Sequence, residues 1–170
     1  MTKQDLDNFA QEIKKHCLMN PESDIKKLSE QFINEFVTYV QCNKIKSKEF
    51  DKLREDYFYD GIGHDFIGSI VEMDKFEDFG YFSCVNLTKK MLSKDLASFE
   101  ISTVVYLILD LESFNTLIGN IEAKIVKDVC SRAINTFGPT SISKEIDEYV
   151  KTFGYVVDDF ILPSMCKDLK

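Results

Sequence analysis

The sequence is poor in several features that would mark common classes of protein. Only two of its 21 basic residues are arginine, Arg54 and Arg132, although arginine is the side chain best suited to bidentate phosphate contacts. This scarcity, together with a net charge of −8 that repels phosphate backbones, argues against nucleic-acid binding. The longest uncharged apolar run covers residues 104–109 and ends at Asp110, far short of the roughly 18 residues of a membrane span. We therefore expect a protein that binds neither nucleic acid nor membranes.

Cysteine is present, but not in the pattern of a disulfide framework. The five cysteines lie at least 25 residues apart, include no C-x-x-C pair and are odd in number (Cys17, Cys42, Cys84, Cys130 and Cys166). The N-terminal residues also lack the apolar stretch of a cleavable leader. We therefore expect a soluble, cytoplasmic protein whose thiols are small buried side chains.

Most of the chain shows apolar residues at the spacing of one helix face, i, i+3, i+4 and i+7. The pattern predicts about seven helices, over residues 2–19, 23–42, 47–57, 79–93, 98–111, 121–137 and 141–163. Residues 60–80 contain four of the seven glycines and are expected to be largely irregular. A chain of 170 residues can bury roughly 70% of its extended surface. We therefore predict a single domain over residues 1–170, a compact all-α orthogonal bundle.

Single residues refine the boundaries of these helices. Thr2 is placed to cap the first helix, with Asp5 three residues later. Residues 103–109 are rich in β-branched side chains and could form a strand, but no neighbouring strand pattern exists, so we favour a helix. Gly154 is expected to bend or divide the last helix, which we expect to end at Pro163.

Nearly all of the net charge is concentrated in residues 55–78, within the irregular segment 55–80. This stretch holds eight acids and one base, Lys75, whereas the other 146 residues hold 21 acids and 20 bases. It also contains five aromatic residues, and segments too charged to fold usually lack aromatics. A solvated charged face is the simpler interpretation. Acidic and aromatic side chains together are also typical of a surface that recognises a basic partner.

Part of this stretch resembles a calcium-binding loop. Asp56, Asp60 and Gly61 occupy positions 1, 5 and 6 of the EF-hand pattern. Position 3 is Phe58 and position 12 is Ile67, where ligand oxygens and a bidentate glutamate are required. We therefore favour a solvated loop with a glycine turn and expect no metal here.

His64-Asp65 resembles the doublet of the HD phosphohydrolases, helical enzymes with the pattern H…HD…D. In this chain the remaining positions would fall to His16 and to Asp110 or Asp158. The resemblance implies a divalent metal, held by these side chains, that activates water for hydrolysis. Metal-dependent phosphohydrolysis therefore stays open as an alternative function.

In its size, acidity, scarcity of arginine and lack of a catalytic motif, the whole chain resembles bacterial immunity proteins of contact-dependent growth inhibition and colicin-type systems. The resemblance implies no cofactor and no catalytic residue, but tight binding to a basic toxin domain, with a nuclease as the leading candidate. The side chains expected to contact the toxin are Asp56, Tyr57, Tyr59, Asp60, Asp65, Glu72, Asp74, Phe76, Glu77 and Asp78. The acids would meet lysine and arginine, while the aromatic side chains would fill the toxin's cleft. A non-catalytic regulatory adaptor is the second alternative.

Overall fold

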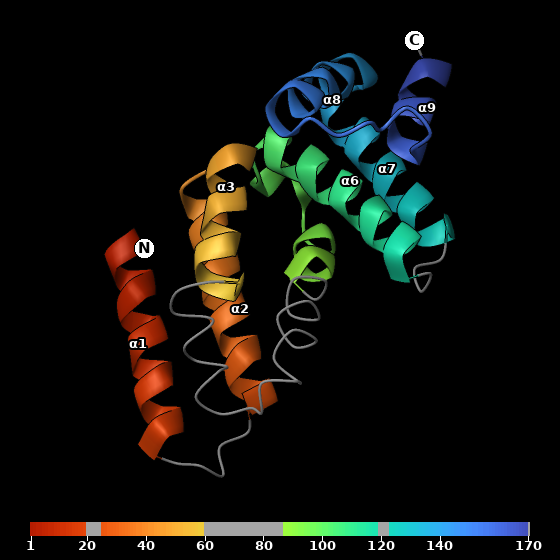
Figure 1. The fold of residues 1–170 in the computed structure, drawn as a ribbon. Coiled ribbons are helices and arrows are strands. Elements are labelled where there is room, and N and C mark those ends of the chain that lie inside the picture. The colour runs from red at the N-terminus through yellow and green to blue at the C-terminus, as the bar shows by residue number, and fades with distance from the viewer. Residues whose placement is uncertain (20–24, 60–86, 119–122, 170) are drawn as a thin grey trace. The chain divides into compact units, whose positions relative to one another are not determined.

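The structure is a computed structural model that describes residues 1–19, 25–59, 87–118 and 123–169. All regular secondary structure in these ranges is helical, so the predicted all-α fold with about seven helices is confirmed. The chain divides into two compact units, which are described separately below (Figure 1). The first unit is Met1–Asn43 with Glu49–Leu87, and the second is Lys44–Lys48 with Thr88–Lys170. The prediction of a single domain stays a prediction.

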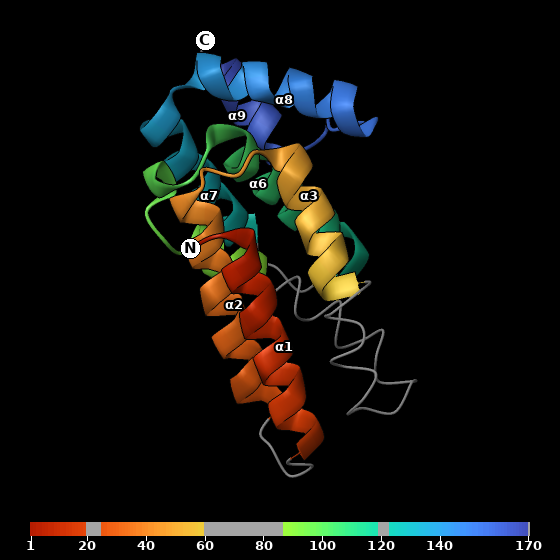
Figure 2. The ribbon, with the colours of Figure 1, turned by 90° about the vertical axis from the view of Figure 1, so that its left-hand side faces the viewer.

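The first unit is built on two antiparallel helices, α1 (Lys3–Met19) and α2 (Ile25–Cys42), which lie side by side in both views (Figure 1 and Figure 2). Most of α3 (Ser47–Arg54) also belongs to this unit. Apolar side chains from all three helices form its core: Leu6, Ala10, Ile13, Ile33, Phe36, Val37, Val40, Phe50 and Leu53. The periodic apolar faces read from the sequence are therefore the faces that pack together.

The predicted cap of α1 is confirmed by two reciprocal hydrogen bonds. The Thr2 backbone N–H donates to Asp5 Oδ2 (2.7 Å), and the Asp5 N–H donates to Thr2 Oγ1 (3.2 Å). These bonds satisfy backbone donors that have no partner within the helix. The hydrogen bond from the Thr2 backbone is the main cause that lowers the pKa of the Asp5 carboxyl.

The second unit is organised around α6 (Ile101–Ile118), which contacts each of the three helices that follow it. They are α7 (Ala123–Phe137), α8 (Pro139–Phe153) and α9 (Ile161–Asp168). Residues 103–109 lie within α6, so the helical interpretation of this β-branched run is confirmed, and every one of them is buried. The helix extends past its predicted end at residue 111.

Residues 44–48 belong to the second unit, where they are attached beside the start of α6. The Thr103 hydroxyl donates to the backbone carbonyl of Ile45. The Lys44 ammonium donates to the carbonyl of Ser98 (2.8 Å), at the end of the short 3-10 helix η2 (Leu96–Ser98). These bonds join segments more than 50 residues apart in the sequence.

The predicted last helix, residues 141–163, is two helices in the structure. Gly154 has a φ of 73° and ends α8, because this left-handed conformation suits glycine at a helix C-terminus. The prediction that Pro163 ends a helix is wrong. Pro163 lies in the first turn of α9. Backbone N–H groups in a first turn have no acceptor within the helix, so a proline there costs no helical hydrogen bond.

The cysteines only partly match the expectation that they are buried. Cys130 and Cys166 are buried, whereas Cys42 is exposed at the end of α2, contrary to that expectation. The side chains of Cys17 and Cys84 lie outside the described part of the chain. None of the helices in the described ranges has both the length and the apolar character needed to cross a bilayer.

Candidate functional site

The acidic stretch 55–78 begins where α3 continues into one turn of π-helix, η1 (Glu55–Tyr59). Of the predicted contact residues, only Asp56 and Tyr57 have side chains within the described part of the chain. Asp56 is exposed, as a contact residue requires. The side chain of Tyr59 lies outside the described part, as do the other predicted contacts, Asp60, Asp65, Glu72, Asp74, Phe76, Glu77 and Asp78.

Tyr57 does not lie on the surface, which corrects its predicted role. Its side chain is only 3% exposed, and its hydroxyl donates a hydrogen bond to Asp7 Oδ1 on α1. Its ring packs against Phe32 at 5.7 Å and Phe36 at 6.0 Å between centroids. Burial is the main cause that raises the pKa of the Tyr57 hydroxyl, and the bond to Asp7 raises it further. Tyr57 therefore anchors the chain and is not available to fill a partner's cleft.

Phe58 is buried beside Tyr57 and completes an aromatic cluster in the first unit. Its ring meets the Phe36 ring edge-on at 5.3 Å, and the Phe36 ring also contacts Phe50 at 6.0 Å. Such edge-to-face pairs contribute about 0.5–1.5 kcal/mol each beyond the area that they bury. The acidic stretch is thus fixed at its start by two consecutive aromatic side chains, while Glu55 and Asp56 face solvent.

The alternative metal sites fall partly outside the described residues. His16 is exposed on α1, Asp110 is half-buried in α6 and Asp158 is exposed after α8. Within the ranges that the structure describes, no three His, Cys, Asp or Glu side chains are grouped to hold a metal. His64-Asp65 lies outside those ranges, as do Asp60, Gly61 and Ile67 of the calcium-type loop. The HD resemblance therefore stays a prediction.

A buried carboxylate joins α6 to α9 in the second unit. Glu112 is 7% exposed, and its Oε1 accepts the backbone N–H of Ile161 (2.7 Å) while Oε2 accepts that of Leu162 (3.4 Å). Burial raises the pKa of this carboxyl, and the two backbone bonds oppose that shift. Burial, followed by the nearby charge of Glu112, raises the pKa of the Cys130 thiol to about 12. Glu112 therefore acts as a helix cap, and Cys130 is held as an unreactive thiol.

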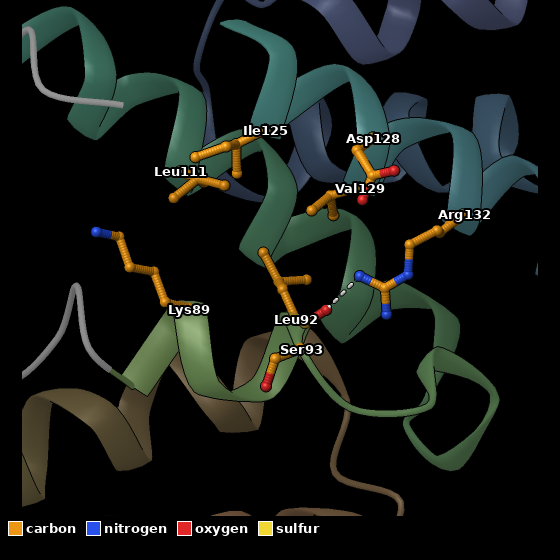
Figure 3. Close-up of a pocket in the computed structure, with 8 residues that line it drawn as sticks. All are labelled: Lys89, Leu92, Ser93, Leu111, Ile125, Asp128, Val129 and Arg132. Atoms are coloured by element: carbon orange, nitrogen blue, oxygen red, sulfur yellow. Dashed lines mark hydrogen bonds between the residues drawn. The ribbon is translucent and has the colours of Figure 1, made fainter. Parts of the chain in front are cut away.

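A hollow of about 330 Å³ lies between α7 and the helical residues 87–92 (Figure 3). The side chains between Lys89 and Arg132 are mostly apolar, and the residues lining the hollow are Lys89, Leu92, Ser93, Leu111, Ile125, Asp128, Val129 and Arg132. The Arg132 guanidinium donates to the carbonyls of Leu92 (2.7 Å) and Lys94 (2.9 Å). These bonds satisfy carbonyls at a helix C-terminus, so Arg132 has a structural role.

The sequence reading missed an exposed surface between α8 and α9. We call it the 155–159 surface: Tyr155 is 62% exposed, Val156 is 80% exposed, and Asp158 and Asp159 are also exposed. It combines aromatic and acidic side chains, as residues 55–78 do in the sequence. The signal that could have revealed it is Gly154. If α8 ends at this glycine, the residues that follow no longer belong to a helix with one buried face, and they can be exposed.

Comparison with known proteins adds no relative to this picture: no family model matches the chain, and no curated protein or solved structure matches it.

Proposed function

We propose that this protein is an immunity-type inhibitor that binds a basic toxin domain, with a nuclease as the leading candidate, and covers its substrate-binding or active site with the acidic surface of residues 55–78. The observation that carries the proposal is the arrangement at the start of this stretch. Tyr57 and Phe58 are buried in the first unit, whereas Glu55 and Asp56 are exposed. Aromatic side chains hold the backbone, and carboxylates are directed outward.

The charge of residues 55–78 favours binding to a basic partner. Residues 55–78 hold eight acids and only one base. The acids repel one another, which costs stability unless a partner relieves the repulsion. A nuclease cleft carries lysine and arginine for the phosphates of its substrate, and carboxylates can occupy the same positions. Opposite charges also steer the encounter, with association rates that reach roughly 10⁸–10⁹ per molar per second at low salt.

The burial of Tyr57 changes how the inhibitor is expected to work. Anchoring one end of the acidic stretch in a folded core lowers the conformational entropy that binding must remove. In this proposal Tyr57 supports the acidic surface from inside the protein. Tyr59 and Phe76 are then the aromatic side chains that we expect to enter the toxin's cleft.

The test uses the gene next to the one that encodes this protein, which we expect to encode a protein ending in a basic toxin domain. We expect that domain to stop bacterial growth when it is expressed alone, and co-expression of this protein to restore growth. The variant carrying Asp65→Lys, Asp74→Lys and Glu77→Lys should fail to restore growth, because its carboxylates can no longer meet the toxin's cations. Its helical circular dichroism should stay unchanged.

A matched control carries the same change in charge at exposed acids elsewhere, Glu12→Lys, Glu30→Lys and Asp168→Lys. It should restore growth as the natural sequence does. The proposal would be overturned if the natural sequence gave no protection, or if the variant in the acidic stretch protected as well as the control.

A further inference from the structure

We propose that the 155–159 surface is a second docking surface, specific for a basic protein partner that offers an apolar side chain among its lysines and arginines. The side chains that carry this inference all belong to the second unit. It goes beyond the proposed function, because it assigns a contact that does not involve residues 55–78.

The surface presents two adjacent apolar side chains to solvent. Tyr155 and Val156 are 62% and 80% exposed, whereas Val157 is 3% exposed and ties the segment to the core. Single exposed apolar residues are common on protein surfaces and need no explanation. Here the two are consecutive in one short segment, and Val150 in the last turn of α8 is also 38% exposed.

The exposed Tyr155 is held in place by a row of packed aromatic rings that leads into the core. Its ring packs against Tyr149 at 6.2 Å between centroids, and Tyr149 packs against Phe153 at 5.0 Å and Tyr106 at 6.0 Å. A supported side chain loses little rotamer freedom on binding. Tyrosine in such a position is favoured among the residues that dominate binding energy.

The backbone of this segment is fixed at both ends. The Gly154 N–H donates to the carbonyl of Val150 (2.9 Å), and the Phe160 N–H donates to the carbonyl of Val157 (3.0 Å). The tip between these bonds is therefore presented in a defined conformation, as a docking surface requires.

Local charge identifies the kind of partner. Between residues 147 and 159 there are four acids and one base, and all five side chains are exposed: Asp147, Glu148, Lys151, Asp158 and Asp159. The base, Lys151, lies 3.8 Å from Glu148 Oε1. The segment 147–159, which contains the apolar pair, thus carries a net charge of −3. A basic partner surface fits this field, whereas phosphate backbones are repelled.

The same charge argues against a second copy of this chain as the occupant. A symmetric dimer places the same patch of both copies face to face, so the carboxylates around Tyr155 would meet their own counterparts. Like charges opposed in this way disfavour association. The complementary partner is therefore a different, basic protein.

The experiment maps peptide binding on the whole chain by amide chemical shifts in nuclear magnetic resonance. The probe is a lysine- and arginine-rich peptide with a central leucine, compared with the same peptide carrying serine in place of leucine. We expect the leucine peptide to shift the amides of residues 154–159, with weaker shifts from the serine peptide. The variant Tyr155→Ser with Val156→Ser should weaken the binding of the leucine peptide about tenfold, which is the effect of about 1.4 kcal/mol.

The control variant removes exposed apolar side chains elsewhere in the second unit, Ile125→Ser with Leu169→Ser, and should bind as the natural sequence does. Equal shifts with the leucine and serine peptides would overturn the inference, because charge alone would then explain binding. Shifts confined to residues 55–78 would also overturn it, and they would leave the proposed function standing. Self-association that the Tyr155 variant abolishes would assign the surface to a second copy and refute a basic partner.

Discussion

Tyr57 and Tyr155 occupy similar chemical surroundings and opposite structural ones. Each packs against at least one aromatic ring and lies close in sequence to aspartate, yet Tyr57 is 3% exposed and Tyr155 is 62% exposed. Tyr57 lies in the π-helical turn that follows α3 and is inside the aromatic cluster, where its hydroxyl donates a hydrogen bond to Asp7. The end of α8 at Gly154 leaves Tyr155 supported on one ring and open to solvent. Backbone conformation, and not acidic and aromatic composition, therefore determines which tyrosine is exposed to solvent.

The largest expected effect comes from removing the buried tyrosine. Tyr57→Ala should lower the free energy of unfolding by about 3–5 kcal/mol, because it leaves a cavity beside the rings of Phe32 and Phe36. Urea unfolding followed by circular dichroism measures this loss. A change below about 1 kcal/mol would break the comparison, because it would place Tyr57 among ordinary surface residues.

The next effect concerns the buried carboxylate of the second unit. Glu112→Ala should lower the free energy of unfolding by about 2 kcal/mol, because the N–H groups of Ile161 and Leu162 lose their acceptor. Glu112→Gln is the matched control, since it keeps a similar volume and one acceptor oxygen. The cap would be unimportant if both variants unfolded at the same urea concentration as the natural sequence.

Glu112 should also give the second unit a dependence on pH. Its folded-state pKa is raised above the ordinary value of 4.5, so the folded state holds the proton more tightly than the unfolded state does. The resulting stability is present below pH 4.5 and is lost as the pH rises through the folded-state pKa. Urea midpoints measured from acid to neutral pH should show this loss in the natural sequence, and Glu112→Gln should lack it.

A smaller effect isolates the hydroxyl of Tyr57 from its ring. Tyr57→Phe keeps the aromatic cluster and removes the hydrogen bond to Asp7, so we expect a loss of about 1 kcal/mol. The pKa of Tyr57 is raised above its ordinary value of 10.0, so its contribution is present below pH 10.0 and is lost as the pH rises above that value. The alkaline loss of stability should therefore be shallower in Tyr57→Phe. Parallel alkaline curves would contradict the raised pKa of the Tyr57 hydroxyl.

The smallest expected effect belongs to the exposed tyrosine. Tyr155→Ala should change the free energy of unfolding by no more than about 0.5 kcal/mol, as surface substitutions usually do. The same urea experiment measures it. A loss above about 1 kcal/mol would mean that the Tyr155 ring stabilises the fold through its contact with Tyr149. Tyr155 and Tyr57 would then differ only in how much they contribute to stability.

Local patterns in the sequence predicted much of the fold. The cap formed by Thr2 and Asp5 and the helical state of residues 103–109 depend on neighbours within a few positions, so spacing was enough to predict them. The burial of Tyr57 was also within reach, because Phe50, Leu53 and Tyr57 follow the spacing of one helix face. The acidic composition around Tyr57 favoured the wrong role.

Other features depend on contacts that no local pattern encodes. The partners of Glu112 lie 49 and 50 residues further along the chain, and Arg132 caps carbonyls about 40 residues before it. The exposure of Tyr155 follows from a single left-handed residue, Gly154, which the sequence allowed either to bend a helix or to end it. Tertiary packing determined these outcomes.

The cap on α9 has a consequence for the order in which the second unit can be assembled during translation. Ribosomes add roughly 5–20 residues per second, so several seconds separate the synthesis of Glu112 from that of the residues that it caps, which lie 49 and 50 positions later. During that interval α6 carries a carboxylate whose permanent partners do not yet exist. Docking of α9 is therefore the step that completes this unit, and a nascent chain halted before residue 161 should hold α6 open to chaperones and proteases.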